Sequence, residues 1–135
     1  MVWEELIKIL VSMAIGCVIG WERKHRDKPV GMRTMSLVCM GATLATMAAV
    51  KYYPNDTGRI IAGIVTGIGF LGAGAIISKG DSVHGLTTAT SIWALAIIGM
   101  IVGLGDFVLA LMASGLMFFM LQFDILKQKL HRHSF

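Results

Sequence analysis

The chain has 135 residues, which is enough for one domain. Hydrophobic residues make up 56% of it and charged residues only 15%, whereas a soluble domain carries roughly 25% charged residues. This composition excludes an ordinary soluble domain. The charges are also clustered, so that no Asp, Glu, Lys or Arg occurs in residues 34–50, 60–78, 85–105 or 107–123. Each stretch is close to the roughly 20 residues that a helix needs to cross the hydrocarbon core of a bilayer.

The first predicted span covers residues 6–22 and is the least apolar of the set. Its one internal charge, Lys8, lies close enough to the end to reach the membrane surface. Trp3 and Trp21 bracket the span, about 27 Å apart at roughly 1.5 Å per helical residue, which fits the two aromatic belts of a bilayer. A cleaved signal peptide is the alternative, but it would need a basic start, and two glutamates stand there instead. We expect a retained span.

Four further helices follow in chain order. They are predicted at residues 34–53, 59–78, 86–104 and 106–124, with a basic tail at 125–135. Pro54 ends the second helix, because proline cannot continue it, and Gly105 marks a tight turn before the last. The predicted fold class is therefore all-α, one domain over residues 1–135, built as a bundle of about five transmembrane helices.

The basic residues are distributed unevenly between the two sides of this bundle. Nine of the twelve Lys and Arg residues fall in the first loop, the loop after the third helix and the tail. The other three are Lys8, Lys51 and Arg59. Because basic loops stay in the cytoplasm, we expect the N-terminus outside and the C-terminus inside. The same asymmetry accounts for the net charge of +4 without a nucleic-acid partner.

Glycine is abundant, at 16 residues, and lies mostly inside the predicted spans. In a bilayer, glycines four residues apart let two helix backbones approach closely. Three pairs have this spacing: Gly16 and Gly20, Gly63 and Gly67, and Gly99 and Gly103. Four glycines should make the third helix thin enough to sit centrally among its neighbours: Gly67, Gly69, Gly72 and Gly74. The G-x-G-x-x-G string at 67–72 does not predict a dinucleotide site, because no strand precedes it.

A run of hydroxyl side chains opens the fourth helix just after Gly85, and Thr87 and Thr88 belong to it. Two interpretations remain open. Either these groups start the helix and bond between helices, or they form a polar lining that faces the glycines of the third helix. Trp93 lies deep for an interfacial residue, and we expect a packing anchor or the lid of a pocket.

Charged residues at the ends of the first two helices predict a polar cytoplasmic site, formed by Glu22, Arg23, Arg33 and Thr34. Glu22 ends its helix and Arg33 starts the next, so each charge opposes the dipole of its own helix end. We predict an ion pair between these two, with Arg23 or Arg26 as further partners. The alternative is that both point into lipid headgroups. The predicted outer-face charges are Asp56, Arg59 and Asp106.

The sequence contains no P-loop, HExxH, GxSxG or CxxC motif. Ionisable residues near a midplane, which usually mark an ion path, are also missing. We expect no enzymatic activity and no cofactor, and the sequence by itself gives transport no support. Cys17 and Cys39 are interpreted as small buried apolar residues.

Four strings, in this order and spacing, resemble the MgtC/SapB family across nearly the whole chain. They are Gly16-x3-Gly20-Trp21-Glu22-Arg23, Gly31-Met32-Arg33-Thr34, Arg59-Ile60 running into GIGFLGAGAI at 67–76, and GLTTATSIW at 85–93. Two positions depart from the family pattern: Gly63 stands where a Gln is expected, and Thr57 where Asp-Pro is common. Many members carry a soluble C-terminal domain, and we expect a chain ending at Phe135 to lack regulation through it.

The resemblance implies a multi-pass protein of a bacterial or archaeal cytoplasmic membrane, associated with magnesium homeostasis. Besides the lipid bilayer, it implies partners among membrane proteins, such as the rotary ATP synthase or a magnesium transporter, and we also expect a homo-oligomer. One hypothesis is an accessory or regulatory protein that binds other membrane proteins through its glycine-rich faces. The other is a transporter of magnesium or another solute. The lack of midplane carboxylates favours the first, and no residue set in the sequence marks a magnesium site.

Overall fold

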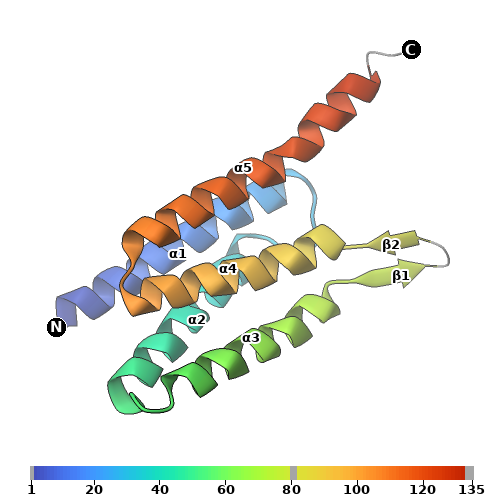
Figure 1. Cartoon of the computed structure of the whole chain (residues 1–135). Coiled ribbons are helices and arrows are strands. Elements are labelled where there is room, and N and C mark those ends of the chain that lie inside the picture. The colour runs from blue at the N-terminus through green and yellow to red at the C-terminus, as the bar shows by residue number, and fades with distance from the viewer. Residues whose placement is uncertain (1, 80–81, 133–135) are drawn as a thin grey trace.

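The computed structural model describes residues 2–79 and 82–132, with side chains for all of these except 78, 79, 82 and 124–132. Five helices and one hairpin follow each other along this part of the chain (Figure 1). The helices are α1 (Val2–His25), α2 (Met32–Tyr52), α3 (Thr57–Gly74), α4 (Leu86–Leu104) and α5 (Phe107–Arg132). The strands are β1 (Ile77–Lys79) and β2 (Ser82–His84). The predicted all-α bundle of five helices is confirmed.

Three of the described helices, α2, α3 and α4, are long and apolar enough to cross a membrane. The apolar part of α5 is shorter, at Phe107–Phe123. Helix α1 begins four residues earlier than predicted, because the two glutamates near its start suit the positive end of the helix dipole. Helix α5 runs on to Arg132, through much of the segment predicted as a tail, and Figure 1 shows it continuing past the rest of the bundle.

The third helix was predicted at residues 59–78 but ends at Gly74, and the hairpin takes the place of its last residues and of the loop that follows. Its strands pair antiparallel, with Ile77 opposite His84. Three residues per strand are too few to give a recognisable alternation of apolar and polar side chains. The hairpin leads directly into Gly85, whose φ of +86° lies in the left-handed region. A Cβ there would stand 2.0 Å from the Ala75 carbonyl oxygen, so only glycine lets the start of α4 lie against the end of α3.

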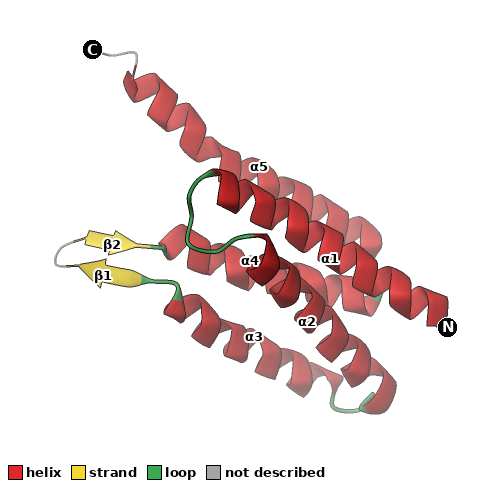
Figure 2. Cartoon of the chain, turned by 180° about the vertical axis from the view of Figure 1, so that it is seen from behind, coloured by secondary structure: helices red, strands yellow, loops and turns green. Residues whose placement is uncertain are grey.

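Helix α4 is the central helix, and it packs against α1, α2, α3 and α5. Its buried face includes Leu95 and Val102, which meet Ile19 of α1 and Met35 of α2 in one apolar core. The prediction that the glycine-rich α3 sits centrally is wrong. Helix α3 lies at the edge against α2 and α4 (Figure 2), and Gly72 is its one buried residue among those described. Glycine has no side chain to bury, so a helix of larger apolar residues occupies the centre instead.

Two of the three predicted glycine pairs bring helix backbones together. A Cβ on Gly16 or Gly20 would stand 2.5 Å from a backbone atom of α2. A Cβ on Gly99 would stand 2.3 Å from the Cys39 carbonyl oxygen, and one on Gly103 would stand 2.8 Å from the same helix. These contacts fix α1 and α4 on two sides of α2.

The bundle has two distinct ends. The basic end comprises the α1–α2 loop, the hairpin, the start of α4 and the C-terminal part of α5, and it carries most of the Lys and Arg residues. The opposite end holds the N-terminus and the α2–α3 and α4–α5 turns (Figures 1 and 2). The sequence-predicted polar residues are therefore divided between these ends.

Candidate polar site at the basic end

A cluster of buried charged side chains lies at the C-terminal end of α1, the end that we predicted to face the cytoplasm. The Glu22 side chain is 2% exposed and that of Arg23 is fully buried. Arg23 donates from Nε to Glu22 Oε2 at 2.6 Å and from Nη2 to Oε1 at 3.1 Å. Arg26, one turn further on, places its Nε 2.6 Å from Glu22 Oε1. One carboxylate is thus held by two guanidinium groups.

The same cluster ties α1 to α5. Arg26 lies in the turn that directly follows α1, and its Nη2 donates to Gln122 Oε1 at 2.7 Å. Its guanidinium thus joins a carboxylate of α1 to an amide of α5, 96 residues later in the chain. Charges taken out of water are stable only when paired and hydrogen-bonded, and this network supplies those partners. Arg23 Nη1 is the exception, because it is buried and has no partner among the described atoms.

The predicted Glu22–Arg33 pair is wrong, whereas the further partners that we predicted, Arg23 and Arg26, both bind Glu22. Arg33 is exposed at the start of α2, and both oxygens of Glu22 are bound to Arg23 and Arg26. The reason is local. Residues four apart lie on the same face of a helix, so Arg26 reaches Glu22 without any rearrangement. The turn after Arg26 carries the chain away, through Asp27 at a φ of +52°.

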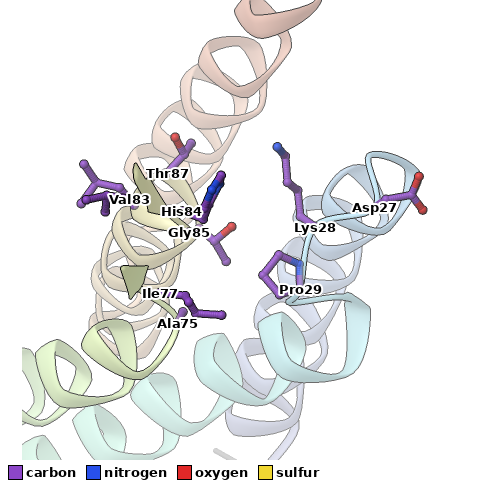
Figure 3. A pocket seen from close by; sticks show the side chains of 11 residues that line it. Asp27, Lys28, Pro29, Ala75, Ile77, Val83, His84, Gly85 and Thr87 are labelled. Carbon is purple, nitrogen blue, oxygen red and sulfur yellow. The ribbon is translucent and has the colours of Figure 1, made fainter. Parts of the chain in front are cut away.

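Beside the charge cluster lies a pocket of about 360 Å³ between the α1–α2 loop and the start of α4. Figure 3 shows Lys28 and Pro29 on one side and His84 and Thr87 on the other, with the Lys28 side chain facing His84 across the gap. The carboxylate of Asp27 points away from that gap. The sides that face each other therefore carry the Lys28 ammonium group and the His84 ring, within a lining that also includes apolar side chains.

The hydroxyl side chains at the start of α4 fall into two groups, one bonded within the helix and one lining the pocket. Thr90 and Ser91 donate hydrogen bonds to carbonyls of their own helix, as the simple helix-start interpretation predicts. Thr87 and Thr88 line the pocket, and Thr88 is 1% exposed. Trp93 is 44% exposed and lines neither this pocket nor the groove between α2 and α3 described below. It is therefore neither a buried packing anchor nor the lid of one of these pockets.

The remaining predicted residues lie elsewhere. Asp56 and Arg59 form an exposed ion pair of 3.4 Å at the opposite end. Asp106 caps α5 by accepting the Leu109 amide at 2.9 Å. Thr34 lines an apolar groove of about 460 Å³ between α2 and α3, where Gly67 also lies. Of the four residues of the predicted polar site, the structure therefore brings Glu22 and Arg23 together. Arg33 and Thr34, at the start of α2, do not join them.

Sequence reasoning missed four residues of this end: Gln122, Lys28, Pro29 and His84. A signal existed for Gln122, because it is an amide in an otherwise apolar stretch. No signal joined Lys28 to His84, since their places on opposite sides of one pocket depend on how the loop and the hairpin fold. Within the described residues, no three His, Cys, Asp or Glu side chains gather in a way that could hold a metal ion.

The fold and this site define a class: a polytopic α-helical membrane protein with an arginine-rich charge cluster at one end of its bundle. The chain belongs to the MgtC family, whose family model matches residues 9–133. Over 109 residues it is 44% identical to Protein MgtC of Salmonella typhimurium, covering 81% of this chain and 47% of that protein.

Two other relatives widen the comparison. The chain is 40% identical over 120 residues to a protein of Escherichia coli named putative magnesium transporter YhiD, covering 82% of this chain and 56% of the relative. It is 37% identical over 139 residues to an uncharacterized protein of Haemophilus influenzae, covering 94% and 58%. The chain therefore spans about half the length of these relatives. No solved structure matches it.

Proposed function

We propose that this protein acts in magnesium homeostasis as an accessory or regulatory membrane protein that binds other membrane proteins. The name of the YhiD relative supports the link to magnesium. The alternative function is magnesium transport, which the name of the same relative also supports. The two roles require different chemistry at the charged end of the bundle, and that difference can be argued from the described residues.

The charge of the buried cluster is the observation that carries the proposal. Mg²⁺ needs oxygen ligands, usually including one or two carboxylates. Glu22 has both oxygens bound to Arg23 and Arg26, so the cluster has one negative and two positive charges. A group with a net positive charge repels a divalent cation. This favours a role in which Mg²⁺ does not pass through the cluster.

The groove between α2 and α3 supports binding to another membrane protein. It is lined by apolar side chains with Gly41 and Gly67 among them. A Cβ on Gly67 would meet no atom within 4 Å, so that part of α3 is open. Small residues on an open helix face let the backbone of another helix approach closely in a bilayer.

Flux and complementation test the proposal together. Liposomes that contain only this protein and an internal Mg²⁺ indicator should take up Mg²⁺ no faster than empty ones, and robust saturable uptake would establish the transporter instead. In cells that need the protein for growth at low magnesium, Gly67→Leu should impair growth because it fills the groove. Gly69→Leu is the matched control, since Gly69 is equally open but does not line the groove. Equal growth of both variants would remove the groove from the proposal.

We further propose that the basic end faces the cytoplasm, as the uneven distribution of Lys and Arg indicates. Arg33 and Arg59 are exposed at the two ends and can each be replaced by cysteine in a chain without Cys17 and Cys39. A membrane-impermeant thiol reagent added to intact cells should label a cysteine at 59 and spare one at 33. The reverse pattern contradicts this orientation.

A further inference from the structure

The start of α4 presents three unused hydrogen-bond donors to the pocket beside it. The first bond within this helix runs from the Ala89 amide to the Gly85 carbonyl, at 2.8 Å. The amides of Leu86, Thr87 and Thr88 precede it and have no acceptor among the residues that the structure describes. Gly85 has no side chain that could cap them. All three residues line the pocket, where the positive end of the helix dipole attracts anions.

Thr88 adds an independent sign of a ligand. Its side chain is 1% exposed and lines the pocket, yet its hydroxyl makes no hydrogen bond within residues 2–79 and 82–132. Thr90, two residues later, donates to the Leu86 and Thr87 carbonyls at 3.1 and 2.9 Å. Thr88 Oγ1 is not one of the fully buried side-chain atoms that lack a partner in the described part of the chain, so this hydroxyl opens into the pocket and is available to a group bound there.

One cationic side chain, that of Lys28, completes the pocket. Lys28 faces His84 across the gap, and the Asp27 carboxylate points away from it (Figure 3). Residues 22–33 carry five cations against two carboxylates, which gives this end of the molecule a positive field that raises the local concentration of anions. Amides at a helix start, a hydroxyl and an ammonium group are the donors that bind phosphate oxygens in proteins.

We propose that this pocket binds a phosphate group, held by the amides at the start of α4, the Thr88 hydroxyl and Lys28. The headgroup of an anionic phospholipid and a soluble phosphate share this chemistry. The position of the pocket at one end of an apolar bundle makes both accessible. The site is separate from the α2–α3 groove, so it does not depend on the accessory role proposed above.

Calorimetric titration of the full chain in maltoside micelles, which contain no phosphate, tests the site. The ligands are inorganic phosphate, a short-chain phosphatidylglycerol, and the diacylglycerol that lacks its phosphate. Binding of phosphatidylglycerol alone assigns the site to a lipid headgroup, and binding of inorganic phosphate assigns it to soluble phosphate as well. If neither phosphate ligand binds, or if diacylglycerol binds as tightly as phosphatidylglycerol, the proposal is wrong.

Matched variants locate the binding. Thr88→Val removes the hydroxyl at constant size and should weaken the affinity about three- to tenfold, as expected for one neutral hydrogen bond. Lys28→Gln removes an exposed charge without disturbing the core and should weaken it about tenfold. Thr90→Val and Lys24→Gln change the same residue types outside the pocket and should leave the affinity within about twofold. Equal losses in the control variants would place the binding elsewhere and overturn the proposal.

Discussion

Helices α3 and α4 carry glycine pairs of the same spacing and use them in opposite ways. Gly99 and Gly103 of α4 lie against α2 so closely that a Cβ would stand 2.3 and 2.8 Å from its backbone. Gly63 and Gly67 of α3 have no atom within 4 Å of the place where a Cβ would be. The spacing of small residues therefore predicts that another helix can pack closely against this one. It does not predict whether that second helix belongs to the same chain.

The larger side chains around each pair account for the difference. Helix α4 surrounds its glycines with residues that bury apolar surface, such as Leu95 and Val102, which are both fully buried. Helix α3 has Phe70 at 82% exposure and Leu71 at 54%. Buried side chains and close backbone contacts thus hold α1, α2 and α4 together, and we call these three helices the packed unit. Helix α3 packs against this unit with one face only and leaves its other faces exposed. Three predictions test this contrast.

The largest effect is expected at the charge cluster that closes the packed unit. Glu22→Gln leaves two arginines at the end of α1 without their anion, which should cost about 3–5 kcal/mol of the free energy of unfolding. Unfolding by SDS in mixed micelles measures this cost. Arg33→Gln is the control, since Arg33 is exposed and should change stability little. Equal losses would show that Arg33, and not Arg26, is the partner that matters.

A change in stability of intermediate size is expected when the two glycine pairs are compared directly. Gly99→Ala places a Cβ 2.3 Å from the Cys39 carbonyl oxygen, so α2 and α4 must separate. Overpacking of this kind costs about 1–3 kcal/mol. Gly67→Ala meets nothing and should leave the unfolding free energy equal or slightly higher, because alanine is the better helix former. A similar loss in both variants would mean that α3 is packed as tightly as α4.

The smallest effect is expected where the packed unit meets solvent. Lys51 donates to Glu5 at 2.7 Å on the exposed surface, and this hydrogen bond, reinforced by the lysine charge, lowers the pKa of the Glu5 carboxyl. A lowered pKa means that the pair stabilises the fold above the ordinary pKa of glutamate and stops doing so as the pH falls through the lowered value. Glu5→Gln should leave stability at neutral pH nearly unchanged and should reduce its acid dependence slightly. A large loss at neutral pH would place this pair inside the packed unit.

Much of the fold could be predicted from the sequence because it depends on long local patterns. Uncharged stretches marked four of the helices, and the spacing of Gly16 and Gly20 and of Gly99 and Gly103 marked close contacts that the structure confirms. The position of α3 could not be predicted in this way. It depends on which helix buries the larger apolar surface, and that is a property of the assembled bundle.

The candidate site was predictable only where it is local. Glu22 and Arg26 are four residues apart, which places them on one helix face, and Arg26 was predicted as a further partner of Glu22. Our argument from helix dipoles chose Arg33, because it considered the two helix ends and not the face of α1 on which Glu22 lies. The phosphate pocket joins Lys28, His84 and Thr88 across a loop, a hairpin and a helix, and no sequence period connects residues of three such elements.

The ion pairs at the opposite end have an electrical consequence. Each cation there has a partner: Lys8 donates to the Gly103 carbonyl at the end of α4, Lys51 pairs with Glu5, and Arg59 pairs with Asp56. That end has three cations against four carboxylates, whereas residues 22–33 at the basic end have five against two. The molecule is therefore polarised along its length. A membrane voltage of 100 mV does about 2.3 kcal/mol of work on each elementary charge that crosses it, so an energised membrane favours one insertion of this bundle over its inverse, and loss of the voltage removes that preference.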